Sequence, residues 1–300
     1  MTDLTDLTDL AELARIRATR PAAVREAAAQ RPVRSLHAAV AERRLLIVAA
    51  DHSARGALKV GDDPLAMADR GRLLERLQLA LSHERVDGVL ATADIVDDLL
   101  LLGALDNKVV LASMNRGGLA GSAWELDDRF TGYDAAGIEA MGFDGGKMLL
   151  RIDLDDPDTN PTLEACARVV AELAARELTA LVEPLPMRRT PDGRLVLSEE
   201  LVDHVRAATV TAAFGSTSAH TWLKLPVSGE IEQVLRATSL PTLLLGGDPG
   251  NDPDRVFDGW RRALRCPTAM GLVPGRALLY PSSGDVAAAV DQAAQVVDGH

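Results

Sequence analysis

Lysine is scarce in this sequence of 300 residues: only four of its 32 lysine and arginine residues are lysine, so 28 are arginine. One of the four, Lys224, lies inside the apolar stretch HTWLKLPV at 220–227. Lysine is almost never fully buried unless another group pairs with it. A chain whose positive charge is nearly all arginine, but which keeps a lysine in an apolar segment, indicates a need for an amine there.

Long apolar runs and a basic surface are also missing. No run approaches the roughly 20 apolar residues that cross a bilayer, and the acidic start MTDLTDLTDLAEL lacks the basic and apolar parts of a signal peptide. The net charge of −12 argues against general binding to nucleic acid or acidic membranes. We therefore expect a cytoplasmic protein that binds neither nucleic acid nor membrane.

Cysteine is nearly absent as well. Cys166 and Cys266 do not have the spacing of metal ligands, and we expect both to be reduced packing residues. The six histidines form no His-x-His or Glu-x-x-His group. Composition therefore gives no support for a metal or another cofactor, and we expect none.

Eight short apolar segments follow one another along the chain, separated by longer segments with helical periodicity. Several are apolar throughout their centres, as expected for parallel strands that helices cover. With 47% hydrophobic residues, the chain can bury a substantial core. We predict an α/β fold, a single (β/α)8 barrel, with strands at 44–51, 86–94, 108–115, 146–154, 178–186, 220–227, 242–250 and 269–275.

Helical periodicity over residues 10–43 precedes the first predicted strand. We therefore expect an N-terminal helical extension over 1–43 and the barrel over 44–300. Two of the predicted helices cover 63–85 and 162–177, and residues 186–200 look like a loop insertion with a turn. A doubly wound sheet is the alternative, but no strand is followed by G-x-G-x-x-G.

Polar residues occur at or near the ends of the predicted strands, where barrel enzymes carry their active residues. They are Asp51, Asp94, Asn115, Asp153, Glu183, Lys224, Asp248 and Arg276.

Two lysines and a glutamate are the strongest candidates for catalysis. An amine that is desolvated, or close to another cation, has a lowered pKa and can attack a carbonyl to form a Schiff base. Lys224 and Lys147, on the sixth and fourth strands, could point into the same interior, and Glu183 on the fifth strand could transfer protons between intermediates. The structural alternatives are two lysines at the barrel rim and a glutamate that caps a turn.

The last two strands end in glycine and arginine. Gly246 and Gly247 end the seventh strand, and Gly275 and Arg276 end the eighth, just before a predicted helix. Backbone amides and an arginine at these two loops are typical of phosphate sites in such barrels. The alternative is a pair of tight turns beside a surface arginine.

The first strand ends in the segment ADHSARGALK. Asp51 and His52 are acid–base candidates, and Arg55 is expected in the loop above the mouth of the barrel. We also expect His52 and Arg55 to contribute to binding of the substrate or its phosphate. Asp51 and His52 also resemble half of a metal site, although no second pair of ligands supports that interpretation.

Several of these segments resemble class I tagatose-1,6-bisphosphate aldolase and its relatives, which form Schiff bases and are (β/α)8 barrels. ADHSARGALK resembles the DQRGALK-type first strand, GKMLLRIDLDDPD the lysine-bearing fourth, LVEPLP the glutamate-bearing fifth and WLKLPV the sixth with its Schiff-base lysine. LLLGGDPG and GLVPGRALL resemble the phosphate-binding ends of the last two strands. The resemblance runs over about residues 44 to 280.

The resemblance implies a role for each matching residue. Lys224 would be the Schiff-base residue, Lys147 the second active-site lysine, Glu183 the acid–base group and Asp51 a polar group on the substrate side. The phosphate site would be Gly247, Gly275 and Arg276. This sequence departs from the family at His52 and Ser53, which stand where the family has one glutamine, so the identity of the sugar does not carry over.

The arginine-rich, lysine-poor composition is typical of a high-GC bacterium, and the chain resembles the aldolase-like proteins of inositol catabolism in actinobacteria. That resemblance implies cleavage of 5-dehydro-2-deoxy-6-phosphogluconate to dihydroxyacetone phosphate and malonic semialdehyde. Other aldolase substrates remain open, namely ketohexose (bis)phosphates and deoxyribose phosphate. We expect a homo-oligomer whose partner is a small phosphorylated sugar.

Two further hypotheses come from other functional classes. One is a metal-dependent lyase that uses Asp51, His52 and other carboxylates. The other is a non-catalytic sugar-phosphate-binding barrel, in which both lysines contact anions.

Overall fold

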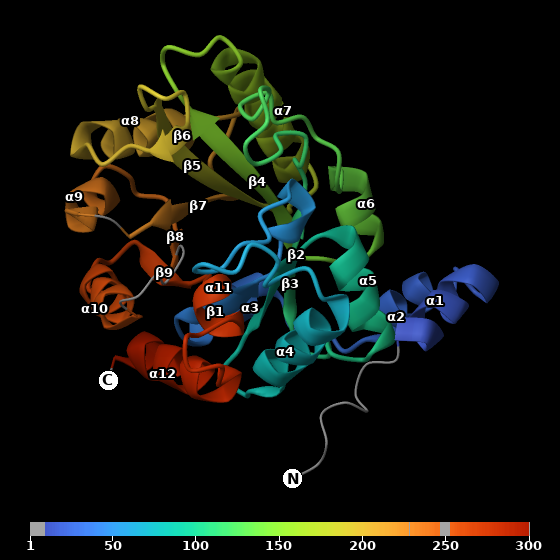
Figure 1. Cartoon of the computed structure of the whole chain (residues 1–300). Coiled ribbons are helices and arrows are strands. Elements are labelled where there is room, and N and C mark those ends of the chain that lie inside the picture. Colours follow the sequence, from blue (N-terminus) through green and yellow to red (C-terminus); the bar gives the residue numbers. More distant parts are fainter. Residues whose placement is uncertain (1–9, 228, 247–252, 300) are drawn as a thin grey trace.

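The computed structural model describes residues 10–227, 229–246 and 253–299. Its centre is a closed barrel of eight parallel strands with helices around it (Figure 1), which confirms the predicted fold. The order around the barrel is β4-β3-β2-β1-β9-β8-β7-β5, and a β4–β5 pairing closes it. The strands are β1 (Leu45–Ala49), β2 (Gly88–Ala91), β3 (Val109–Ser113), β4 (Gly145–Ile152), β5 (Thr179–Arg189), β7 (Thr221–Pro226), β8 (Thr242–Leu245) and β9 (Ala269–Leu272).

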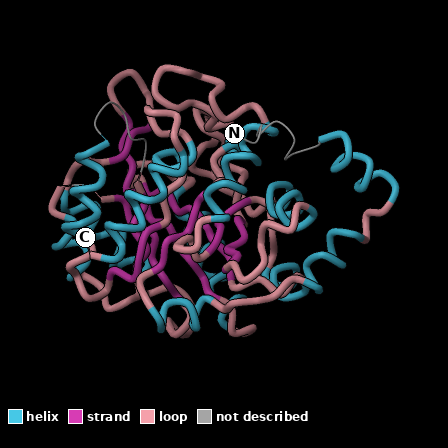
Figure 2. The backbone as a smooth tube through the Cα atoms, turned by 90° about the horizontal axis from the view of Figure 1, so that it is seen from below, coloured by secondary structure: helices cyan, strands magenta, loops and turns pink. Residues whose placement is uncertain are grey.

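Helices cover the outside of the barrel, and three of them precede the first strand (Figures 1 and 2). The helices are α1 (Leu10–Thr19), α2 (Ala23–Gln30), α3 (Leu36–Glu42), η2 (Ser53–Arg55), α4 (Arg70–Ser82), α5 (Ala93–Leu101), α6 (Ala135–Ala140), α7 (Thr159–Ala174), α8 (Leu201–Ala212), α9 (Ile231–Arg236), α10 (Pro253–Ala263), α11 (Arg276–Leu279) and α12 (Val286–Asp298). No helix of the described ranges is long and apolar enough to cross a membrane.

Two predicted boundaries were wrong for reasons that the local structure explains. Residues 186–200 are not only a loop, because β5 continues to Arg189 and pairs antiparallel with β6 (Leu195–Leu197) across the turn at 190–194. The helix predicted over 63–85 begins only at Arg70, where the Asp69 carboxylate accepts a hydrogen bond from the Arg72 amide as a helix cap.

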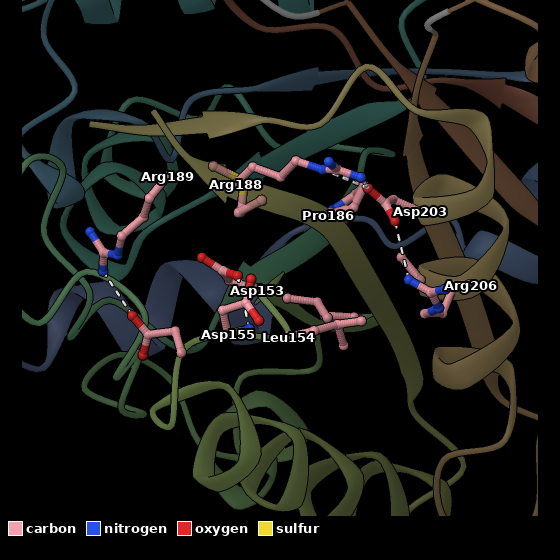
Figure 3. A pocket seen from close by; sticks show the side chains of 12 residues that line it. Asp153, Leu154, Asp155, Pro186, Arg188, Arg189, Asp203 and Arg206 are labelled. Carbon is pink, nitrogen blue, oxygen red and sulfur yellow. Dashed lines mark hydrogen bonds and ion pairs between the residues drawn. The ribbon is translucent and has the colours of Figure 1, made fainter. Parts of the chain in front are cut away.

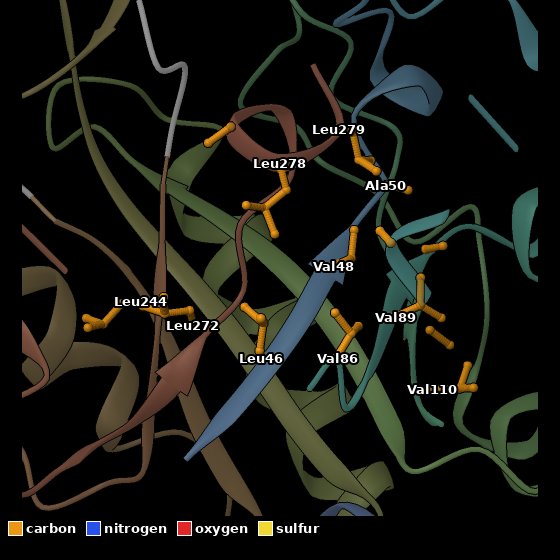
Figure 4. Close-up of a cluster of buried hydrophobic side chains, with 14 of the residues drawn as sticks. Leu46, Val48, Ala50, Val86, Val89, Val110, Leu244, Leu272, Leu278 and Leu279 are labelled. Atoms are coloured by element: carbon orange, nitrogen blue, oxygen red, sulfur yellow. The ribbon is translucent and has the colours of Figure 1, made fainter. Parts of the chain in front are cut away.

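Alternation along each strand separates two apolar layers. In β1, Leu45, Ile47 and Ala49 face the barrel interior, whereas Leu46 and Val48 face the surrounding helices. Figure 4 shows part of the outer layer between strands and helices. The next inward position after Ala49 is Asp51, so the strand period itself directs this carboxylate into the mouth of the barrel.

Helix α3 closes the lower end of the barrel, which is the end at the amino termini of the strands, opposite the polar mouth. Its Leu36 and Ala39 are buried in the same apolar cluster as Leu45, Val109 and other interior side chains of the strands. The Leu36 amide also donates to the Asp144 carboxylate, just before β4, at 2.7 Å. Although the boundary predicted between residues 43 and 44 remains a prediction, α3 packs as part of the barrel.

An Asp-Gly pair begins both β2 and β4. The carboxylates of Asp87 and Asp144 each accept a backbone amide of the preceding strand, from Leu46 and from Val110, at 2.9 Å. A Cβ on Gly88 or on Gly145 would lie 2.2 Å from a carbonyl oxygen of the next strand. These pairs therefore fix strand spacing at the lower end, which in such barrels serves stability.

Shortening the buried Leu36 side chain of α3 should destabilise the protein. We expect Leu36→Ala to lower the free energy of unfolding by about 3 kcal/mol, because it opens a cavity in a buried cluster. Val33→Ala, at a side chain that is 59% exposed in the same segment, is the matched control and should change it by less than about 0.5 kcal/mol. Urea unfolding of both variants checks this, and equal losses would contradict it.

Candidate active site

A cavity of about 400 Å³ opens at the carboxyl ends of the barrel strands. It brings together nearly every residue that the sequence singled out for chemistry. Its lining contains Asp51, His52, Arg55, Lys147, Glu183, Lys224, Gly246, Gly275 and Arg276. Gly247 and Asp248 were also predicted to lie here, but they fall outside the described residues.

Strand periodicity and register bring the two lysines and the glutamate together. Val182 of β5 pairs with Leu223 of β7, so the next residues, Glu183 and Lys224, lie side by side. Below them, Leu181, Trp222 and other interior side chains form an apolar floor. Lys147 lies within β4 and is only 2% exposed, so it is not a surface lysine.

The Glu183 carboxylate connects the two amines. Its Oε2 lies 2.5 Å from Lys147 Nζ, and its Oε1 lies 3.0 Å from Lys224 Nζ. All three side chains are buried. Each lysine therefore has an anionic partner, and this pairing answers how an apolar strand can contain Lys224.

Burial dominates the pKa of both amines. It lowers the pKa of Lys147 well below the usual range, against the attraction of Glu183, and Lys224 lowers it further. Burial also lowers the pKa of Lys224, with Arg116 and Arg55 acting in the same direction and Glu183 opposing them. Burial would raise the pKa of Glu183, but the two lysines outweigh it and hold the pKa below the usual range.

Asp51 extends the cluster toward β3. Its Oδ2 accepts hydrogen bonds from Lys147 Nζ and from Ser113 Oγ, both at 3.1 Å, and from Arg116 Nη2. Sequence reasoning missed Ser113 and Arg116. The available signal was their position at the end of the third strand, beside Asn115, which was recognised.

Arg55 lies in the cavity wall, but protein partners hold its guanidinium. It donates to the backbone oxygens of Asn115 at 2.6 Å and Gly118 at 3.0 Å, and it forms a buried ion pair with Asp128. Asn115 in turn holds the edge of β4, accepting from the Leu149 amide at 2.8 Å. These contacts tie the loop after β3 to the cavity, which is a different arrangement from a phosphate ligand above the mouth.

His52 packs against Gly275 on the other side of the cavity. A Cβ on Gly275 would lie 2.5 Å from His52 Cε1 and 2.6 Å from the Ala49 carbonyl oxygen, so only glycine allows this approach. Burial, together with the charges of Lys224 and Arg276, lowers the pKa of His52 to about 3. His52 is therefore a neutral imidazole at physiological pH.

Gly246 and Arg276 border the same side. A Cβ on Gly246 would lie 2.6 Å from the Trp260 ring, so packing alone already requires a glycine at this strand end. Arg276 begins α11 beside Gly275, and its Nη1 donates to the Lys59 carbonyl oxygen at 3.4 Å. This contact holds the guanidinium at the rim of the cavity.

Two of the predicted strand-end residues lie elsewhere. Asp94 is in the first turn of α5, because β2 ends at Ala91, and it pairs with Arg70 outside the cavity. Asp153 lines a neighbouring cavity of about 440 Å³ (Figure 3).

That neighbouring cavity is lined by charges that pair with one another. Arg188 and Arg206 both contact Asp203, at 2.6 and 3.1 Å, and Arg189 contacts Asp156 at 2.8 Å (Figure 3). It has no lysine or histidine among its described lining residues. The cavity with Lys224 is therefore the better candidate for chemistry.

No three His, Cys, Asp or Glu side chains of the described residues are grouped so that they could hold a metal ion. Both cysteines are free thiols, and burial raises the pKa of Cys166 to about 12.

A family model described as Cgl0159-like matches residues 43–294. The chain belongs to the Cgl0159-like family. A crystal structure of Cgl0159 from Corynebacterium glutamicum is 48% identical in sequence, with a TM-score of 0.91 and 96% of each chain covered. A comparison with curated proteins finds no match.

More distant structures share the fold of this family member. An archaeal fructose 1,6-bisphosphate aldolase is 16% identical, with a TM-score of 0.66, over 92% of this chain and 100% of that one. Another archaeal structure, of a fructose-1,6-bisphosphate aldolase with its catalytic lysine bound to a carbinolamine intermediate, is 14% identical, with a TM-score of 0.64, over 91% and 99%. At such identities the similarity shows the barrel fold alone.

Removal of the shared carboxylate should destabilise the protein in a pH-dependent way. We expect Glu183→Gln to lower the free energy of unfolding by about 3 kcal/mol at pH 7, because the buried amines lose the carboxylate that compensates a protonated lysine between them. The deficit should shrink at pH 9.5: both amines have lowered pKa values in the folded state, so deprotonating them costs less as the pH approaches their unfolded pKa.

Chemical unfolding at the two pH values measures the deficit. Glu199→Gln, at an exposed carboxylate, is the control and should change stability little at either pH. A deficit that stays constant from pH 7 to pH 9.5 would contradict the assignment of Glu183 as the carboxylate that compensates a protonated lysine in this cluster.

Proposed function

We propose that this protein is a class I aldolase that cleaves a phosphorylated keto substrate through a Schiff base on Lys224. The observation that carries the proposal is the buried Lys147–Glu183–Lys224 cluster at the carboxyl end of the barrel. A desolvated amine with a lowered pKa is the nucleophile that imine chemistry requires. The shared fold of Schiff-base aldolases gives independent support.

The reaction assigns a step to each group of the cluster. The neutral amine of Lys224 attacks the ketone carbon, and Glu183 passes protons while the carbinolamine loses water to become an iminium. A base then takes the proton from the hydroxyl on the carbon two positions away from the iminium carbon. That C–O becomes a carbonyl, the C–C bond breaks, and its electron pair moves to the iminium to form an enamine.

The second half of the reaction releases the other product. The enamine carbon takes a proton, and water hydrolyses the restored iminium, which frees the ketone and returns the Lys224 amine. Lys147 holds Glu183 ionised and can donate to a substrate oxygen, while Asp51 is the polar group that faces the substrate beside it. The chemistry balances without an external oxidant or reductant.

The phosphate is assigned to the side of the cavity formed by β8 and β9. Arg276 supplies the charge there, and Gly246 and Gly275 leave the backbone accessible beside it. Gly247 belongs to the same proposal from its resemblance to the phosphate-binding family. His52 borders this side as a neutral group. Arg55 drops out of the phosphate site in this proposal, because Asp128 and two carbonyl oxygens already hold it.

Apolar lining supports the more specific substrate, 5-dehydro-2-deoxy-6-phosphogluconate, which would give dihydroxyacetone phosphate and malonic semialdehyde. The wall on β4, β5 and β6 presents Leu149, Leu185, Met187 and Leu197. A hydroxyl against such a wall would lose its hydrogen bonds to water at a cost of about 1–3 kcal/mol. A substrate without a hydroxyl on that side fits better than a fully hydroxylated sugar.

Other candidates rest on fewer observations. A ketohexose (bis)phosphate or deoxyribose phosphate would use the same lysine, and a non-catalytic sugar-phosphate-binding barrel the same cations. A metal-dependent lyase would need Asp51 as a ligand, yet that carboxylate accepts from Lys147, Ser113 and Arg116. Assembly into a homo-oligomer stays part of the proposal without a described interface.

Covalent trapping should identify Lys224 directly. We expect borohydride to reduce the imine with dihydroxyacetone phosphate into a stable adduct, which mass mapping locates on Lys224. The scarcity of lysine makes the mapping clear, since only Lys59, Lys108 and Lys147 compete within the chain. Lys224→Arg should abolish both the adduct and turnover.

Lys108→Arg is the matched control, because the Lys108 amine donates to Val86 O at 2.6 Å, away from the cavity lining. It should trap like the unaltered protein, and so should the protein treated with a chelator. An adduct that survives Lys224→Arg, or turnover that a chelator abolishes and Zn²⁺ restores, would overturn the Schiff-base assignment.

Substrate choice should follow the apolar wall. With dihydroxyacetone phosphate as donor in the synthetic direction, kcat/KM for malonic semialdehyde should exceed that for glyceraldehyde 3-phosphate by at least about tenfold. Leu185→Asn, which adds a hydrogen-bonding group to the wall, should reduce that ratio, whereas Val210→Asn on an exposed face of α8 should not. A preference for glyceraldehyde 3-phosphate would favour a ketohexose bisphosphate instead.

A further inference from the structure

Five charged side chains form one continuous chain across the cavity floor. Arg116 contacts Asp51, Asp51 lies 3.1 Å from Lys147, Lys147 lies 2.5 Å from Glu183, and Glu183 lies 3.0 Å from Lys224. Lys147, Glu183 and Lys224 lie within β4, β5 and β7, Asp51 follows β1, and Arg116 lies in the loop after β3. All are buried, so water screens their charges only weakly.

The signs of the charges alternate along this chain. Arginine is always protonated in proteins under ordinary conditions, and although burial lowers the pKa of Arg116 to about 10, it stays cationic at neutral pH. Lys147 lies between two carboxylates, which favour its protonated form against the effect of burial, and with Lys147 protonated the first four groups sum to zero. A protonated Lys224 leaves the chain with one excess positive charge, and a neutral Lys224 leaves none.

Among the described residues that line the cavity, no other charged group supplies an anion to compensate a protonated Lys224. Asp51 and Glu183 are the carboxylates among the described lining residues. Arg55 pairs with Asp128, and Arg151 lies 3.4 Å from Glu125. His52 is neutral, and Arg276 adds a positive charge at the rim.

We propose that Arg116 is a positioning residue that keeps Lys224 in its neutral, nucleophilic form by completing this chain of alternating charges. The inference rests on the proposed role of Lys224 as the Schiff-base amine. The positive charge of Arg116 compensates Asp51. The positive charge of Lys147 then compensates Glu183, so no uncompensated negative charge remains to stabilise a protonated Lys224. The direction of the pKa of Lys224 agrees: burial lowers it most, and Arg116 is the first of the cations that lower it further.

The charge count predicts opposite effects for two substitutions. Arg116→Gln removes a positive charge, so a protonated Lys224 would bring the chain to zero, and the titration of Lys224 should move up by about one pH unit. Asp51→Asn removes a negative charge and should move it down. The double variant Asp51→Asn with Arg116→Gln removes one negative and one positive charge, so the titration midpoint of Lys224 should lie close to that of the unaltered protein. Arg116→Lys keeps the positive charge and should also leave the midpoint nearly unchanged.

Competitive labelling measures this titration without substrate. Trace acetic anhydride acetylates neutral amines, so the rate at Lys224 against pH, relative to the exposed Lys59, gives the midpoint for each variant. At a pH below the midpoint, acetylation of Lys224 should be about tenfold slower in Arg116→Gln than in the unaltered protein, and the two rates should become equal at higher pH. A merely structural role would change the rate equally at all pH values.

Three outcomes would overturn the inference: an unchanged midpoint in Arg116→Gln, equal directions for the two single variants, or no recovery in the double variant. If Arg116→Gln does not fold, the downward shift in Asp51→Asn still decides, because it depends on the same charge count. Borohydride trapping on the unaltered protein is read separately. Its failure would remove the proposed aldolase activity, whereas the labelling result would still decide whether Arg116 controls the amine.

Discussion

One carboxylate shared by two buried amines is the interaction on which the cavity depends. Glu183 contacts Lys147 on one side and Lys224 on the other, above an apolar floor where an unpaired charge would be costly. The arrangement requires β5 to lie between β4 and β7, and the closing pair of the barrel provides that order. Fold and chemistry therefore depend on the same neighbouring strands.

The sequence predicted the parts of the site that strand periodicity determines. Lys147, Glu183 and Lys224 each lie at an inward position of an apolar strand, so their meeting follows once the barrel closes. Arg116 could not be found in this way, because the path of the loop after β3 decides where its guanidinium lies. Arg55 was found, but its partners Asn115 and Asp128 are far from it in sequence, so strand periodicity could not predict these contacts.

Strand ends were the weakest part of the prediction, for a local reason. Asp94 follows an apolar run like the other candidates, yet Thr92 already precedes the first turn of α5, and the aspartate stabilises that helix start and pairs with Arg70. Helix-start residues and active residues share the same short list of polar types. Only the position of the last strand residue tells them apart, and periodicity does not fix it.

The charge of the cavity is opposite to that of the whole chain. The chain has a net charge of −12, whereas the described residues that line the cavity include four arginines, two lysines and two carboxylates. Such a contrast guides small anions toward the mouth while the rest of the surface repels them. Two of these arginines, Arg55 and Arg151, are held by carboxylates of the loop after β3.

Helix α3, which closes the lower end of the barrel, also limits how ligands and water can enter and leave the cavity. Leu36 and Ala39 of α3 seal the lower end with the same dry packing that forms the floor under Lys224. Water, an incoming ligand and anything released must then share the upper opening. A reaction at Lys224 that first releases and later consumes a water molecule would use this one opening for every step. The first product would have to leave before water could enter to release the second product.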